Sequence, residues 1–176
     1  MRLRRLLPAL VMLTAPAFSG CGWTPLYADT ASAPASEELR AIRVDPISDR
    51  IGQRLQIALR SSLNPTGEST PQRYRLITTL ATYLSNLGIQ SQGLATLGKL
   101  DVYATYNLVD VRSGNTLLVN TVHVANSFDL NPNQYSTVVA EDDAAVRSVA
   151  ELNQEIVTRL TLFLQRRTAE KSGKPS

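Results

Sequence analysis

The residue that can carry covalent chemistry is Cys21, the only cysteine in 176 residues, and Ser19 and Gly20 stand directly before it. A lone cysteine in an exported chain has no partner for an intramolecular disulfide, so its sulfur is either modified or left as a free thiol. Export is indicated by three arginines within the first five residues and by the apolar run 6–17, which is too short to span a bilayer. We therefore predict a signal peptide over residues 1–20 and modification at Cys21.

Phe18 completes a segment, with Ser19, Gly20 and Cys21, that resembles the lipobox of bacterial lipoproteins, although leucine is commonest where Phe18 stands. The resemblance implies a diacylglycerol thioether on the Cys21 sulfur, cleavage before Cys21, and acylation of the new amino terminus. Several acyl chains on one residue anchor a protein stably, because each buried methylene contributes about 0.8 kcal/mol. We expect a mature protein that lies on a membrane without spanning it. The alternative is that Cys21 is a small apolar residue beside an ordinary cleavage site.

The mature chain carries no excess of positive charge. The full sequence has 18 basic and 15 acidic residues, and the leader holds three of the arginines and no acid, which leaves 15 of each sign. Nucleic-acid binding through overall basicity is therefore not expected. About 155 residues remain, enough for one domain with a substantial core.

Other candidates for catalysis are few. His123 is the sole histidine, so a serine hydrolase mechanism would need it, but an ordinary strand position explains it better than a catalytic role does. The acids at 141–143 fall at the predicted start of a helix, where negative side chains stabilise the helix dipole. We therefore expect no enzyme activity, no catalytic residues, no metal site and no cofactor.

Residues 39–167 have the periodicities of a single domain. Asp49 stands at the N-cap position of the first predicted helix, and residues 112–115 form a predicted hairpin turn. Four segments have the composition and alternation of β-strands: 39–47, 73–87, 97–111 and 116–128. Two segments repeat apolar residues at helical spacing: 50–63 and 138–167.

The order β-α-β-β-β-α predicts an α+β fold: a mostly antiparallel four-stranded sheet with two helices packed on one face. The flanking segments are small and polar. We expect residues 21–38 to be a lipidated tether and residues 168–176 a flexible tail. Within the tether, Trp23 and Tyr27 are amphipathic rings beside the acylated residue, where they can contact a membrane or a partner. The alternative is that Trp23 and Leu26 cap the domain core.

The predicted sheet is poor in charge. No charged residue occurs between Leu76 and Gly98, and only five occur between Leu76 and Ala140. A sheet face open to water normally carries lysine and glutamate, whereas the cores of protein interfaces lose charged residues and keep aromatic ones. The uncovered face is therefore expected to be buried against another protein. The alternative is a threonine-rich sheet that merely satisfies strand propensity.

These features resemble one family. The opening C-G-W-T-P-L-Y at residues 21–27 is similar to the C-G-[FW]-x-P-L-Y start of the lipopolysaccharide-assembly lipoproteins, LptE. The region 103–116 and the long terminal helix around 144–164 are similar as well. The resemblance implies a non-catalytic lipoprotein of the outer membrane, on its periplasmic side, that plugs the β-barrel LptD, assists its assembly and binds lipopolysaccharide. Gly22 in place of aspartate after the cysteine agrees with outer-membrane sorting.

The lipid-binding residues of that family are basic, which makes four residues of this chain candidates for contact with lipid A phosphates: Arg73, Arg75, Lys99 and Arg112. An alternative assignment is an auxiliary lipoprotein of an envelope lipid-transporting ABC system, which is also short, anchored and α/β in content. The protein that co-purifies with the anchored form separates the two assignments, since one predicts a large barrel and the other an inner-membrane transporter.

Overall fold

The computed structural model describes residues 33–65, 67, 71–89 and 95–171. All of these residues belong to the second of the two units into which the chain divides, Ser32–Ser176. The predicted signal peptide, the predicted acylation site Cys21, and the aromatic residues Trp23 and Tyr27 lie outside the described residues, as does the end of the predicted tail from residue 172.

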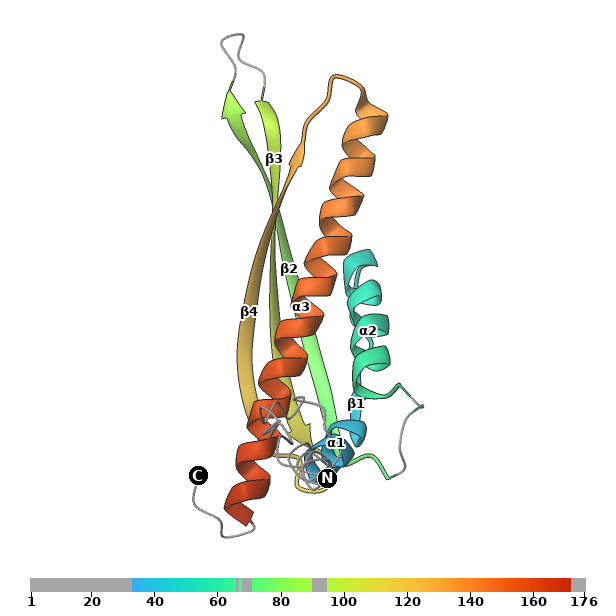
Figure 1. Ribbon diagram of the computed structural model, residues 1–176, viewed down its shortest axis with the longest axis vertical. Helices are drawn as coiled ribbons and strands as arrows, with labels where there is room; N and C mark the ends of the chain where they lie inside the picture. Colours follow the sequence, from blue (N-terminus) through green and yellow to red (C-terminus); the bar gives the residue numbers. More distant parts are fainter. Residues whose placement is uncertain (1–32, 66, 68–70, 90–94, 172–176) are drawn as a thin grey trace, which may run out of the picture. The chain divides into compact units, whose positions relative to one another are not determined.

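The second unit is an α+β domain, as predicted. Its sheet has the order β1-β2-β3-β4, with β1 parallel to β2 and the other neighbours antiparallel. The helix α2 joins the parallel pair β1 and β2, which makes a β-α-β crossover. Figure 1 shows the elements, whose bounds are α1 Ala33–Arg40, β1 Ile42–Val44, α2 Arg50–Leu63, β2 Tyr74–Ile89, β3 Ala95–Asp110, β4 Thr116–Asp129 and α3 Gln134–Lys171.

The helix α1 is a difference from the sequence prediction. Its residues 33–38 belong to the segment predicted to be a tether, and the predicted strand from residue 39 shrinks to the three residues of β1. The cause is a tertiary contact that composition does not reveal. Glu38 accepts a hydrogen bond of 2.6 Å from the Tyr74 hydroxyl, and Leu39 packs against the core. The last helix, α3, is also longer than predicted and includes residues 168–171.

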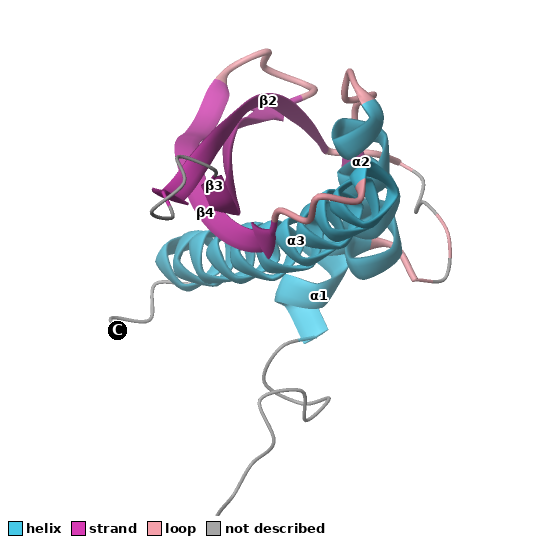
Figure 2. Cartoon of the chain, turned by 90° about the horizontal axis from the view of Figure 1, so that it is seen from above, coloured by secondary structure: helices cyan, strands magenta, loops and turns pink. Residues whose placement is uncertain are grey.

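The core lies between the sheet and the helices. Along β3 the predicted inward phase is confirmed, since Leu100, Val102, Ala104, Tyr106 and Leu108 are all buried. The matching stripe on α3 comprises Ala145, Val149, Leu152, Ile156, Leu160 and Leu164. Figure 2 shows the long strands curving so that their concave side faces α3 and α2. The long helix therefore packs its apolar stripe along most of the sheet.

The start of α2 and the turn of the hairpin are held in different ways, the first by a backbone hydrogen bond from Gln53 N to Asp49 O and the second by a side chain. Asp49 occupies the N-cap position as predicted, but its side chain makes no capping hydrogen bond and its φ is 69°. In the β3–β4 turn, which is confirmed, the Asp110 carboxylate accepts hydrogen bonds from the backbone nitrogens of Arg112 and Ser113. Gly114 supplies the positive φ of 70° that this turn requires.

The outer edge of β4 is engaged by α3. Arg159 donates to the carbonyl oxygen of Thr121 at 3.2 Å, and Arg147 donates to that of Ser127 at 3.0 Å. Each arginine also pairs with an acid one helical turn away, Arg147 with Asp143 and Arg159 with Glu155. When side chains donate hydrogen bonds to the free carbonyl groups of an edge strand, those groups are less available for pairing with another strand.

Gly98 of β3 pairs with Phe128 of β4, and a Cβ built on Gly98 would lie 2.4 Å from the Phe128 ring. We predict that Gly98→Ala lowers the free energy of unfolding by about 1–3 kcal/mol, because the ring must leave its packed position. Urea unfolding followed by circular dichroism measures it. In a Phe128→Leu background the same substitution should cost much less, and an equal cost in both backgrounds contradicts the explanation.

Candidate functional site

The candidate site is the face of the sheet turned away from the helices, which we call the open face. Because side chains alternate along a strand, the residues between the buried ones on β2, β3 and β4 point outward here. The pairing places them in five cross-strand rows: Ile77-Asn107-Val119, Thr79-Thr105-Thr121, Ala81-Tyr103-His123, Tyr83-Asp101-Ala125 and Ser85-Lys99-Ser127. Within these rows only Lys99 and Asp101 are permanently charged side chains.

Those two charges neutralise each other. The Lys99 ammonium lies 2.9 Å from Asp101 Oδ1, and His123 Nε2 lies 2.8 Å from the same oxygen. The Asp101 side chain is only 15% exposed, so its neighbours cover most of it. Hydrogen bonds from Lys99, and then from His123, hold the pKa of Asp101 below its usual value. These five rows therefore contain one ionic cluster without a large net charge.

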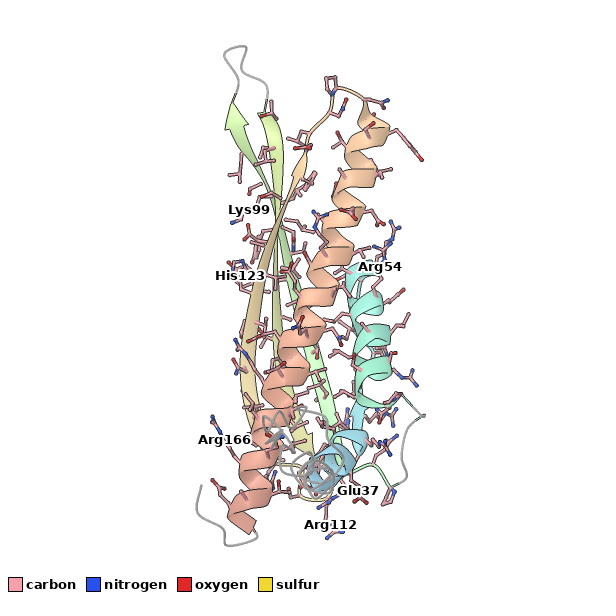
Figure 3. The ribbon with its side chains drawn as sticks, in the orientation of Figure 1. Glu37, Arg54, Lys99, Arg112, His123 and Arg166 are labelled. Carbon is pink, nitrogen blue, oxygen red and sulfur yellow. The ribbon has the colours of Figure 1, made fainter. Side chains whose placement is uncertain are left out.

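Aromatic rings surround this cluster. The Tyr103 and His123 rings stack with centroids 4.2 Å apart, and Tyr83 meets Tyr103 edge to face at 5.9 Å. Together with the ionic cluster they line a shallow depression of about 620 Å³. Figure 3 shows Lys99 and His123 on the side of the sheet away from α3. Such a surface offers stacking area and hydrogen-bonding groups to a partner.

His123 and Asp101 resemble two members of a hydrolytic triad in their geometry. A triad also needs a nucleophile hydrogen-bonded to the histidine. Among the described residues, the hydrogen bond of the His123 ring is the one to Asp101, which leaves no serine or cysteine in that position.

The four basic residues predicted to contact lipid do not form one site. Arg73 pairs with Glu38, and Arg75 pairs with Asp45. Arg112 lies in the β3–β4 turn at the same end of the sheet, where Val111 N donates to Arg73 O. Lys99 is placed within β3, ten residues from the Val109 that pairs with Arg75, which is about 33 Å along the strand.

Glu38 connects α1 to the sheet at that end. Its carboxylate accepts from Tyr74 and from Arg73, and the Arg73 guanidinium lies 5.8 Å from the Tyr74 ring centroid. Burial, and then the hydrogen bond to Glu38, raises the pKa of Tyr74 to about 12. Arg73 is thus part of the packing of α1, which makes it a weaker candidate for a ligand contact than the sequence indicated.

The predicted start of the last helix is wrong, because α3 begins at Gln134 and the acids at 141–143 lie beyond its first turn, where they do not stabilise the helix dipole. Two of these acids make ion pairs instead. Asp142 contacts Arg54 at 2.9 Å and Arg50 at 3.4 Å, and Asp143 pairs with Arg147. The described residues hold no group of three or more histidine, cysteine, aspartate or glutamate side chains that fits a metal ion. In the same part of the chain, no helix is both long and apolar enough to cross a membrane.

Sequence reasoning missed the Asp101 cluster and the Tyr83-Tyr103-His123 stack. Because the strands and the turn were predicted, the sequence could have placed Tyr103 close to His123 on neighbouring strands. A register irregularity between Leu108 and Val109 shifts their pairing by one residue relative to a regular hairpin. The bulge leaves no clear sequence signal.

The ionic cluster has a consequence at acid pH. Because folding lowers the pKa of Asp101, its contribution to stability is present above the unfolded-state value of about 3.9 and is lost as pH falls through the folded-state pKa. We predict that Asp101→Asn removes this part of the acid loss, so that its urea midpoint falls less than that of the wild type between neutral and strongly acid pH. Lys99→Met should give an intermediate loss, and identical acid losses in all three proteins refute the assignment.

No family model matches the sequence. A search of curated proteins likewise gives no significant match.

Two solved bacterial structures are similar in fold. A crystal structure of a protein from Caulobacter crescentus, described as a lipoprotein, superposes with a TM-score of 0.60 at 21% identity and covers 75% of this chain and 96% of that one. A minor lipoprotein from Acinetobacter baumannii gives 0.54 at 17% identity, with 69% and 90% covered. At such identities the likeness concerns the fold, so this chain has the fold of two bacterial lipoproteins.

Proposed function

We propose that this protein is a non-catalytic lipoprotein of the outer membrane that docks its open face against the inner wall of the LptD barrel. In this role it helps the barrel to assemble and binds lipopolysaccharide during its passage to the outer leaflet. The observation that carries the proposal is the composition of the open face, which is long, mostly uncharged and lined by threonine, alanine, serine and tyrosine.

A face of this kind favours a protein neighbour over water. Several of its apolar and aromatic side chains are well exposed in the isolated chain, among them Tyr83 at 62% and Val119 at 63%. The ionic cluster of its five rows is internally paired, and Arg75 on the same face of β2 is paired with Asp45, so docking need not bury these charges unpaired. Uncharged hydroxyl groups can exchange water for the polar groups of a partner at low cost, which suits the polar interior of a barrel.

The anchor is proposed on separate grounds. The segment ending in Cys21 has the small residues and the preceding basic and apolar leader of a lipoprotein signal. The fold shared with two bacterial lipoproteins supports this assignment. Acylation at Cys21 would hold the domain at the periplasmic side of the outer membrane, where a barrel in the same membrane is within reach.

Among the basic candidates, Arg112 is the best placed to meet lipid phosphate. Its side chain is exposed in a turn, and within the described residues no acid is paired with it. Arg73 and Arg75 are already engaged by Glu38 and Asp45, and Lys99 belongs to the open face that would lie against the barrel. An exposed guanidinium in a turn can form two parallel hydrogen bonds to phosphate.

We predict that Thr105→Glu, at the centre of the open face, strongly reduces recovery of the barrel with the anchored protein, because an unpaired charge buried in an interface costs about 3–5 kcal/mol. Affinity capture from detergent-solubilised envelopes, followed by mass spectrometry, measures it. The matched control is Thr158→Glu on the exposed side of α3, which should leave recovery unchanged.

The same capture tests the assignment itself. Recovery of an inner-membrane transporter in place of a barrel would replace this function with that of an auxiliary transport lipoprotein. Equal barrel recovery with both glutamate variants would show that the barrel is held by another surface.

We further predict that Arg112→Ala lowers the affinity of the purified, acylated protein for lipopolysaccharide about tenfold, because a charge-assisted hydrogen bond is lost. Titration with lipopolysaccharide in a non-ionic detergent provides the measurement. Arg43→Ala removes an exposed arginine from β1 and serves as the control. Unchanged binding after Arg112→Ala excludes that residue, and unchanged binding after the double change Arg73→Ala and Arg75→Ala excludes that pair.

A further inference from the structure

A second surface lies on the opposite side of the sheet. A cleft of about 350 Å³ opens where the first turns of α2, the first half of α3 and the inner face of β2 and β3 meet. Its apolar wall is formed by Leu84, Leu100, Val138 and Ala145. Arg50 and Arg54 stand at its margin. This volume lies at the lower end of the range of ligand sites, roughly 300–1,000 Å³.

The cleft exists because α2 is shorter than the strands it covers. Figure 1 shows β2 and β3 continuing past the end of α2 that carries Arg50. Leu84 belongs to the inward phase of β2 and pairs with Leu100, yet Leu84 is 54% exposed while Leu100 is 3% exposed. On α3, Val138 is 57% exposed beside the same cleft. Inward-facing apolar surface is thus left without a helix to cover it.

The charges at the margin are balanced. Asp142 accepts from Arg54 at two distances, 2.9 and 3.1 Å, and lies 3.4 Å from Arg50, while Glu141 also lines the cleft. Two guanidinium groups and two carboxylates leave no net field to draw a charged group inside. The part of a ligand that enters should therefore be uncharged and apolar.

Arg50 differs from Arg54 because its side chain is largely exposed to solvent. Its side chain is 78% exposed, against 31% for Arg54, and its longer contact is with a carboxylate that Arg54 already engages. A guanidinium in this state can turn toward a phosphate that stays in solvent while a chain lies in the cleft.

We propose that this cleft holds one acyl chain of a phosphorylated lipid, with Arg50 beside the lipid's head group. The proposal rests on the proposed function, which makes lipopolysaccharide the lipid concerned, and it adds where on the chain an acyl tail lies. The small volume fits a single chain, and the open face on the other side of the sheet stays available to a barrel.

Photo-crosslinking in cells that express the full chain tests the proposal. A benzophenone amino acid at Leu84 reports on the cleft, and the same probe at Arg112 reports on the lipid contact proposed for the turn. We expect a lipopolysaccharide adduct at position 84. Val138→Asp should reduce that adduct at least fivefold, because a carboxylate is placed on the apolar wall. The matched control Val146→Asp, on the same helix at a valine that is 49% exposed and does not line the cleft, should leave the adduct unchanged.

The outcomes separate the cleft from the function. An adduct at 112 with none at 84 overturns the cleft and leaves the proposed function standing, whereas no lipopolysaccharide adduct at either position counts against both. A protein adduct alone at 84, or a lipid adduct that survives Val138→Asp, also overturns the cleft. If Val138→Asp does not accumulate in the membrane, a second variant is used. Thr82 is an exposed residue of β2 that lines the cleft, so Thr82→Trp fills the cleft and must reduce the lipopolysaccharide adduct at position 84 to the same extent.

Discussion

The packing of one long helix along one face of a long sheet determines what the rest of this molecule can do. The buried stripe of α3 runs from Ala145 to Leu164 and meets the inward side chains of the strands over most of their length. Apolar burial of this kind is the main stabilising term in a domain of this size. Because all the described helices pack on the concave side, none of them covers the other face of β2, β3 and β4.

The strands make that division sharp. Side chains alternate along a strand with a period of two, so every second residue of β3 points into the core. The residues between them point to the open face: Lys99, Asp101, Tyr103, Thr105 and Asn107. The outside set is not the lysine- and glutamate-rich surface of a solvated sheet. Its charges are paired with each other, and its rings are stacked. A surface with these properties is stable in water and loses little when a protein replaces the water.

Elements with local periodicity were predictable from the sequence: the long strands, α2, most of α3, the turn at 112–115 and the inward phase of β3. Features that depend on contacts between residues far apart in the sequence were not predictable. Helix α1 is held by Glu38 against Tyr74, and the cleft margin depends on Arg54 and Asp142, which are 88 residues apart. No local pattern in a single sequence encodes such pairs. The bulge between Leu108 and Val109 shifts the strand register by one residue, and this shift is what places Tyr103 opposite His123.

Because the helices differ in length, the two faces of the sheet differ in polarity at the same position along the strands. Where α2 ends, the inward-facing Leu84 stays partly uncovered beside the buried Leu100, while Tyr83 and Asp101, one residue away on each strand, belong to the open face. A lipid chain on one side and a protein wall on the other would thus be separated by a single layer of backbone. A rigid sheet suits this arrangement, since it can hold an apolar ligand near a barrel wall without either displacing the other.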